Sequence, residues 1–231
     1  MAETILDSRM LRIADCVPSG AILADIGTDH GKLPVYLAQK DKIKRAVAAD
    51  INEMPLQKAI NNIKTNNLQN KIDTYLTNGL QGVEKFSPDC VVIAGMGGEL
   101  IEQILEEGTI DKHNVKFIIQ PMTKEGSLRK YLCKNGYLIT DEHIVKEGKL
   151  YQIICAEYDG NVRAISEAES LVGKINIEKA EELFGELIER VIDRTLVKIE
   201  GKKRANLDVT EETDCLKQLT DIKEKYYGIN K

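Results

Sequence analysis

Short apolar runs alternate with stretches of helical spacing over the first two thirds of the chain. The apolar runs predict strands at 21–27, 45–51, 72–77, 90–95 and 115–120. Apolar positions that recur every three or four residues predict helices at 31–40, 54–67, 98–107 and 124–134. Strands and helices that alternate in this way form a mostly parallel sheet with helices on both faces. An α/β fold of the doubly wound, Rossmann-like type is therefore expected.

The alternation ends with two consecutive strands. Residues 137–145 and 149–158 flank the turn Glu147-Gly148-Lys149, and strands joined by so short a turn run antiparallel. They complete a sheet of seven strands, closed at one edge by an antiparallel hairpin.

The hydrophobic period changes after Asp159-Gly160. Between residues 175 and 199 the apolar side chains follow one helical stripe, and a second stripe runs from Leu216 to Tyr226. The run Gly201-Lys202-Lys203-Arg204 is expected to break the two helices apart. We therefore predict two domains: 1–160 with the sheet, and 161–231 with an antiparallel helical pair of coiled-coil type.

Charge and cysteine usage narrow the function classes. A net charge of −5 over 231 residues, 30% of them charged, argues against a protein that coats nucleic acid, so a polyanionic partner must meet a local basic patch. Five scattered cysteines without a C-x-x-C pair predict neither a metal site nor a disulfide framework. Free thiols, no signal-peptide core and no apolar run of membrane-spanning length predict a cytoplasmic protein that binds no membrane.

The first strand ends in an acid and enters a glycine turn that opens a helix, in the sequence Asp25-Ile26-Gly27-Thr28-Asp29-His30-Gly31. An α/β sheet presents a nucleotide-like cofactor at such a turn. A dinucleotide fingerprint needs a third glycine beside the pyrophosphate, and the carboxylates of Asp25 and Asp29 repel that group. They suit a cationic ligand with an ammonium and a sulfonium, which indicates S-adenosylmethionine.

A second acid supports this interpretation. Asp50 ends the next strand, about twenty residues beyond the turn, where such folds place the carboxylate that accepts both ribose hydroxyls. Either acid alone is equally well explained as a helix cap or a polar strand end. Their occurrence on successive strands around a glycine turn favours a cofactor site.

Three further strand ends carry candidate groups. Asn78-Gly79 can present an amide and a close backbone to an adenine ring, although Asn-Gly is also simply a good turn. Gly95-Met96-Gly97 lets the backbone approach a ligand. Many amino-group methyltransferases carry Asn/Asp-Pro-Pro-Tyr/Phe at this place, and its absence argues against methylation of exocyclic N6. Gln120-Pro121 is either a pocket group or a strand-end turn.

Asp29 and His30 lie within the first turn, where a methyl acceptor must approach. His30 is either a base or a polar turn residue. The basic clusters at residues 40–45 and 202–204 are usually solvated faces, and with an RNA partner they become candidate phosphate contacts.

Together, the segments 25–34, 49–51, 78–80, 93–98 and 120–121 resemble the bacterial tRNA (adenine-N1)-methyltransferases that modify position 22. The resemblance covers roughly residues 5–158, and the helical tail is similar to the coiled-coil domain of that family. Three positions depart from the family pattern, with Thr28 in place of Ser, Asn78 in place of Asp and Met122 in place of Asn. The resemblance implies a class I methyltransferase fold, S-adenosylmethionine as donor and N1 of a tRNA adenine as acceptor.

On this basis the expected cofactor-binding residues are Asp25, Gly27, Thr28, Asp50, Ile51, Asn78, Gly79 and Gly95. The expected catalytic residues are Asp29 and His30. The expected substrate-binding residues are Met96, Gly97, Gln120, Pro121, Lys202, Lys203 and Arg204. No metal is expected, and a monomer is favoured. A small-molecule methyltransferase and a non-catalytic RNA- or protein-binding scaffold remain the alternatives.

Overall fold

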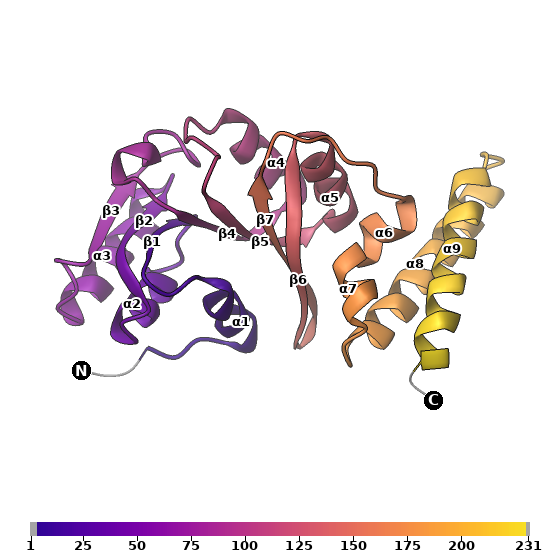
Figure 1. The fold of residues 1–231 in the computed structure, drawn as a ribbon, viewed down its shortest axis with the longest axis horizontal. Helices are drawn as coiled ribbons and strands as arrows, with labels where there is room; N and C mark the ends of the chain where they lie inside the picture. The colour runs from indigo at the N-terminus through magenta and orange to yellow at the C-terminus, as the bar shows by residue number, and fades with distance from the viewer. Residues whose placement is uncertain (1–3, 230–231) are drawn as a thin grey trace.

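The structure is a computed structural model that describes residues 4–229. Its strands form one mixed sheet in the order β3-β2-β1-β4-β5-β7-β6 (Figure 1). The strands are β1 (Ala21–Ile26), β2 (Ile43–Asp50), β3 (Ile72–Leu76), β4 (Cys90–Gly97), β5 (Lys116–Thr123), β6 (Tyr137–Glu147) and β7 (Lys149–Tyr158).

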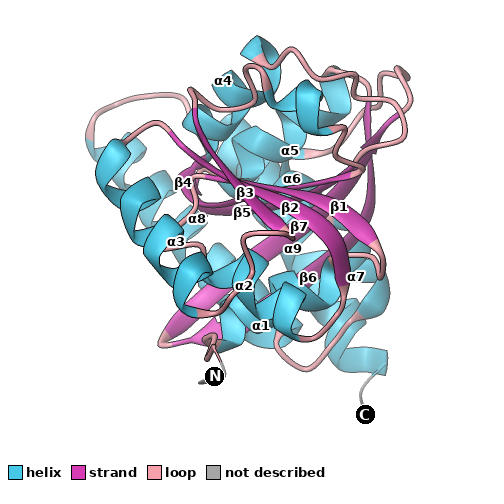
Figure 2. Cartoon of the chain, turned by 90° about the vertical axis from the view of Figure 1, so that its left-hand side faces the viewer, coloured by secondary structure: helices cyan, strands magenta, loops and turns pink. Residues whose placement is uncertain are grey.

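Helices lie on both sides of the sheet (Figure 2). They are α1 (Ser8–Cys16), α2 (Lys32–Gln39), α3 (Glu53–Thr65), α4 (Gly98–Glu107), α5 (Glu125–Lys134), α6 (Glu167–Val172), α7 (Lys174–Lys179), α8 (Phe184–Arg204) and α9 (Thr210–Ile229), with a short 3₁₀ helix η1 (Val83–Phe86).

The strand directions confirm the predicted architecture. Strands β1 to β5 pair in parallel, and β7 pairs antiparallel with both β5 and β6. Because β1 has β2 on one side and β4 on the other, the strand order reverses there. Ligands of doubly wound folds bind at the carboxyl ends of the strands beside such a reversal.

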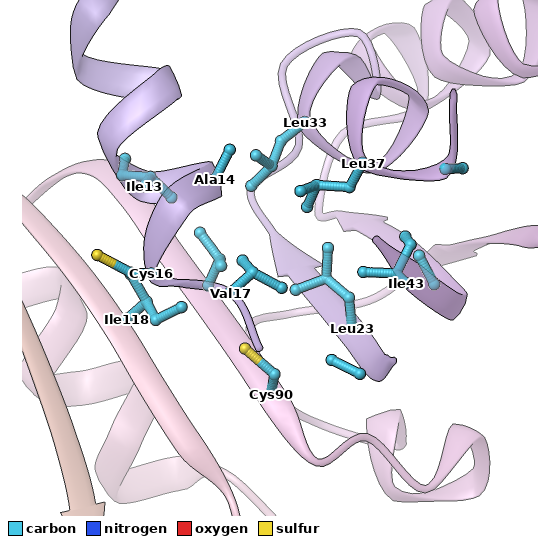
Figure 3. Close-up of a cluster of buried hydrophobic side chains, with 14 of the residues drawn as sticks. Ile13, Ala14, Cys16, Val17, Leu23, Leu33, Leu37, Ile43, Cys90 and Ile118 are labelled. Carbon is cyan, nitrogen blue, oxygen red and sulfur yellow. The ribbon is translucent and has the colours of Figure 1, made fainter. Parts of the chain in front are cut away.

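The sheet separates two apolar layers. One layer packs α1, α2 and α3 against alternate strand residues such as Leu23 and Ile118 (Figure 3). The other packs α4 and α5 against the intervening residues, among them Ala24 and Phe117. Successive strand residues point to opposite faces, so burial of both faces explains why the central strands are continuous apolar runs rather than alternating ones.

The N-terminal helix α1 begins directly after its N-cap residue, Asp7. The Asp7 side chain accepts a hydrogen bond from the amide of Met10 at 2.7 Å, which satisfies one of the unpaired first-turn donors. The preceding Ile5 lies outside the helix and is 87% exposed. Helix α1 packs on α2 and on strands β5, β6 and β7, and brings its first turn to the carboxyl ends of β1 and β4.

The C-terminal segment is helical, as predicted, but its breaks lie elsewhere. The stripe at 175–199 is not one helix, because α7 ends at Lys179, Ala180 takes a left-handed φ of 48°, and α8 begins at Phe184. The expected break at residues 201–204 is wrong as well, since these residues form the last turn of α8. Lysine and arginine are good helix formers and are favoured at a helix C-terminus, which outweighs one exposed glycine.

The tail packs on the edge hairpin of the sheet. A third apolar cluster joins Ile144 of β6 and Leu150 of β7 to helices α6, α8 and α9. Beside it, the Arg129 guanidinium of α5 donates to Glu142 at 2.6 Å, and both side chains are fully buried. Arg129 also donates to the carbonyl oxygen of Ser170 in α6. The tail thus shares an apolar core with the sheet, and its backbone hydrogen-bonds to both members of the buried ion pair.

Candidate active site

Two carboxylates lie at the carboxyl edge of the sheet on neighbouring strands. Asp25 is the fifth residue of β1, and Asp50 is the last residue of β2, its parallel neighbour. Asp25 is buried, with 6% of its surface exposed, whereas Asp50 is half-buried. Asp50 Oδ1 accepts a hydrogen bond from the amide of Asn52 at 2.7 Å. The pairing predicted from the sequence is therefore present, with one acid inside the fold and one at its surface.

The environment of Asp25 makes its negative charge costly. Burial raises the pKa of this carboxyl from 3.8 to about 6, and the nearby acids Asp29 and Asp50 push it further in the same direction. Thr28 opposes the shift, because its Oγ1 donates to Asp25 Oδ2 at 2.6 Å. A ligand with a positive charge beside Asp25 would stabilise the ionised form.

Gly27 is required by its backbone and by its neighbour. Its φ is 72°, in the left-handed region, and the amides of Gly27 and Thr28 both donate to the carbonyl oxygen of Ala49 in β2. A Cβ atom at Gly27 would meet the end of the Met96 side chain, which would have to move. The turn is thus fastened to β2 in a backbone conformation that favours glycine.

The rest of the first turn presents an accessible acid. The side chain of Asp29 is 77% exposed; its Oδ1 lies 3.4 Å from His30 Nε2, and its Oδ2 lies 3.8 Å from Lys32 Nζ. His30 has a φ of 59°, and its carbonyl oxygen accepts from the Asn62 side chain at 3.0 Å. This turn therefore holds Asp29 and His30 together at the opening of the site.

A cavity of about 470 Å³ lies where β1, β4 and the N-terminal segment meet. Four predicted residues line it, namely Asp25, Gly27, Asp29 and Gly95. Its other lining residues are Ile5, Leu6, Asp7, Arg9, Met10, Lys32, Leu33, Ala94 and Met122. The contribution of residues 5–10 is not visible in the sequence, because they carry no motif and reach the site only through the packing of α1.

Arg9 connects this cavity to Gln120. The Arg9 Nη1 atom donates to Gln120 Oε1 at 2.7 Å, and Gln120 Nε2 donates to the carbonyl oxygen of Pro121 at 2.6 Å. The Arg9 guanidinium also lies 5.6 Å from the ring centre of Tyr151. Gln120 is completely buried, so Arg9 is the group of this network that reaches the cavity. Arg9 belongs to no motif in the sequence, and only the packing of α1 brings it to this place.

The remaining strand-end residues lie along the same edge. Met96 and Gly97 end β4, where Met96 pairs with Pro121 and Gly97 precedes the first turn of α4. Ile51 is 61% exposed just after β2, and Asn78 is exposed after β3. Gly79 has a φ of 58° and packs against Ile104. Ile51, Asn78 and Gly79 do not line the cavity but continue the edge past β2 and β3.

The basic residues of the tail lie apart from this edge. Lys202, Lys203 and Arg204 end α8, and Figure 1 shows α8 and α9 at the end of the molecule opposite to β3 and α3. Lys202 Nζ pairs with Glu212 of α9 at 2.7 Å, so it holds the two helices together. Arg204 is 83% exposed in its side chain.

Among residues 4–229, none of the helices combines the length and the apolar character that crossing a membrane requires.

Comparison with known proteins places the chain in a family. Residues 6–154 match the model of a methyltransferase domain. Over 170 residues the chain is 37% identical to the tRNA (adenine(22)-N(1))-methyltransferase of Bacillus subtilis, which covers 69% of this chain and 71% of that protein.

Solved structures agree over nearly the whole chain. The crystal structure of Streptococcus pneumoniae Sp1610, a putative tRNA (m1A22) methyltransferase in complex with S-adenosyl-L-methionine, superposes with a TM-score of 0.83 at 30% identity and covers 95% of this chain and 100% of that one. The structure of M. capricolum TrmK with S-adenosyl-homocysteine gives a TM-score of 0.76 at 26% identity, over 96% of this chain and 97% of that one. The chain therefore belongs to the methyltransferase-domain family and, within it, to the tRNA (adenine(22)-N1)-methyltransferases.

Proposed function

We propose that this protein transfers the methyl group of S-adenosylmethionine to N1 of adenine 22 in tRNA. The observation that carries the proposal is the pair of carboxylates Asp25 and Asp50 on adjacent strand ends around the Gly27 turn, together with the cavity that Asp25 and Asp29 line. Family membership supports it, because the B. subtilis relative bears the name of that activity.

The residues present fit the cofactor. Asp50 can accept both hydroxyls of a ribose, and the turn at Gly27 and Thr28 lets backbone approach the ligand closely. The buried carboxylate of Asp25 faces the cavity and suits the cationic amino acid part. The exposed apolar side chain of Ile51 and the Asn78-Gly79 turn offer a surface and an amide to the adenine ring.

S-adenosylmethionine, when bound, supplies a methyl group on a positively charged sulfur. Adenine N1 has an in-plane lone pair, so it attacks without first losing a proton, and positive charge then develops on the purine. Alignment and stabilisation of that charge are therefore what the protein must provide. The Asp29 carboxylate, open at the mouth of the cavity, is the group we assign to this role, and His30 beside it is the second candidate.

The acceptor must enter as an unpaired base, since N1 lies on the Watson–Crick edge. Met96, Gly97, Gln120 and Pro121 form the ends of β4 and β5 on the side where it enters. Gln120 acts there through Arg9, whose guanidinium lies between Gln120 and the cavity.

A basic surface beside this entrance suits the tRNA backbone. A second cavity, of about 240 Å³, shares Met122 with the first and is lined by Lys124, Lys149, Arg190 and Arg194. The last two residues belong to α8, which also carries Lys202, Lys203 and Arg204 at its end. We propose that these cations contact phosphates, and that the helical pair α8 and α9 is an RNA-binding domain of coiled-coil type within 161–231.

We further propose that the protein works as a cytoplasmic monomer and that methyl transfer requires no metal. The five cysteines are buried and form no disulfide, as is usual for proteins of a reducing compartment.

The test is transfer of a tritiated methyl group to unmodified tRNA, followed by mapping of the modified base. A matched tRNA with guanine at position 22 is the control and should accept no label. Label at another nucleotide would overturn the proposed position. Cofactor binding without transfer would favour a scaffold, and transfer only to small molecules would favour the other enzyme class.

A further inference from the structure

A cluster of two cysteines and a histidine lies outside the residues assigned to methyl transfer. Cys16 ends α1, His143 lies on β6 and Cys155 lies on β7. One potential ligand atom from each residue, sulfur from the cysteines and a ring nitrogen from the histidine, lies within 4.8 Å of the other two. Both cysteines are buried, with 8% and 1% of their surface exposed, and Figure 3 shows the Cys16 sulfur pointing away from the neighbouring Cys90.

The histidine is arranged as metal-binding histidines usually are. His143 Nε2 lies 3.3 Å from Asp141 Oδ2, and the carboxylate of Asp141 is itself paired with Lys179. His143 Nδ1 is buried and has no hydrogen-bond partner. A carboxylate that holds one ring nitrogen fixes the tautomer and leaves the lone pair of the other nitrogen available to a metal. A buried polar atom without a partner needs an explanation, and a ligand is one.

We propose that Cys16 Sγ, Cys155 Sγ and His143 Nδ1 bind one soft, thiolate-preferring cation of the Zn²⁺ or Cu⁺ type. Two sulfurs and an imidazole select such ions, whereas Mg²⁺ and Ca²⁺ require oxygen ligands. Binding releases the protons of both thiols to solvent and changes no oxidation state.

The site would fasten α1 to the edge hairpin. The first turn of the same helix brings Asp7, Arg9 and Met10 to the cofactor cavity. The cation would therefore stabilise the position of the C-terminal end of α1. It would take no part in methyl transfer at the cavity beside the N-terminal end of this helix.

The experiment uses the full chain, purified anaerobically under reducing conditions and freed of metal by a chelator. Zn²⁺ or Cu⁺ is added in separate arms of the experiment, and the excess metal is removed by dialysis. Elemental mass spectrometry then measures the metal that stays bound. About one ion per chain is expected in at least one arm, and the arm with the tighter retention identifies the cation. Co²⁺ in place of Zn²⁺ should give a thiolate-to-metal charge-transfer band.

The variants Cys16→Ser, Cys155→Ser and His143→Ala should each weaken binding by about a hundredfold or more. Asp141→Asn should weaken it by roughly 10–100-fold, the effect of losing a group that orients a ligand. Cys133→Ser removes a buried thiol outside the cluster and is the matched control, with unchanged binding expected. A rise in the thermal midpoint of the wild type on addition of metal needs no variant and guards against misfolded substitutions.

Failure of the wild type to retain either ion in stoichiometric amount overturns the proposal. So does an equal loss of binding in Cys133→Ser, which would make the effect nonspecific. A mass decrease of two hydrogens on air oxidation, with a Cys16–Cys155 crosslink and no metal binding in the reduced protein, would assign the pair to a disulfide instead. None of these outcomes depends on tRNA methylation, so the metal site and the proposed function are tested separately.

Discussion

At the scale of single residues, Asp50 provides the test of the cofactor site. It lies at the end of β2, half-buried, and its removal does not open the core. Asp50→Ala should weaken S-adenosylmethionine binding by roughly 1.5–3 kcal/mol, the scale for loss of charge-assisted hydrogen bonds. Calorimetry of the folded variant measures this, and an unchanged affinity would remove Asp50 from the site.

Asp29 tests the chemistry at the same scale. If its carboxylate stabilises the cationic adenine, Asp29→Asn should lower the single-turnover methylation rate a hundredfold or more, on the order of 3 kcal/mol. Cofactor affinity should change little, because Asp29 is 77% exposed and is not assigned to the cofactor. A loss of only a few-fold would make Asp29 a turn residue and turn attention to His30.

Asp25 predicts a pH dependence. Its pKa is about 6 in the folded protein against 3.8 in the unfolded chain, so the folded state holds this proton more tightly. Stability is therefore lost as pH rises from 3.8 to 6, and the full penalty is present above 6. The stability of Asp25→Asn relative to wild type should accordingly increase by about 1–2 kcal/mol between pH 5 and pH 8.

Urea unfolding of the cofactor-free proteins at both pH values measures this difference. Cofactor affinity should behave in the opposite way: it should rise with pH through 6 in the wild type, as the Asp25 carboxylate forms, and stay flat in Asp25→Asn. Parallel stability curves for the two proteins would contradict the assignment of the proton to Asp25.

At the scale of elements, the tail packs beside a buried ion pair of the sheet and hydrogen-bonds to it. Glu142 accepts from Arg129 at 2.6 Å and from the amide of Ile175 at 2.9 Å, with no exposure to water. Glu142→Gln leaves the guanidinium buried without its charge partner and should cost roughly 3–5 kcal/mol in the free energy of unfolding. The exposed pair of Lys146 and Glu186 is the matched control, and Lys146→Met should cost less than about 1 kcal/mol. Similar losses in the two variants, measured by denaturant unfolding, would show that burial of the pair is unimportant.

At the scale of the whole molecule, the tail should add phosphate contacts. Lys202 is needed for its pair with Glu212, so the informative variant is Lys203→Ala with Arg204→Ala. Loss of two contacts should weaken tRNA binding and lower the slope of log Kd against log salt by roughly 1–2, because fewer counterions are released.

Lys58→Ala with Lys64→Ala removes the same charge from exposed positions of α3, outside both basic clusters, and serves as control. Filter binding over a range of salt concentrations compares the variants. A wild-type slope in the tail variant would show that residues 203 and 204 make no phosphate contact, and an equal decrease of the slope in the control would make the effect nonspecific.

Local patterns in the sequence determined much of this protein. Continuous apolar strands, the glycine turn after Asp25 and the hairpin around Gly148 sufficed for the sheet, its edge and the strand ends that carry the candidate site, because each depends on residues close together in the chain. The breaks of the tail did not follow in the same way, since Gly201 is tolerated inside α8 and Ala180 adopts a left-handed conformation that no local signal indicated.

Only the tertiary structure decided what meets across the sheet. It brings Arg9 to Gln120, buries Arg129 against Glu142, and gathers Cys16, His143 and Cys155 from α1, β6 and β7. In the sequence these groups are separated by up to 139 positions and show no common spacing. Scattered cysteines therefore predicted no metal site, whereas folding places two of them beside a histidine: hydrophobic packing of α1 on the hairpin fixes their distances, and packing over such separations leaves no periodic trace in the chain.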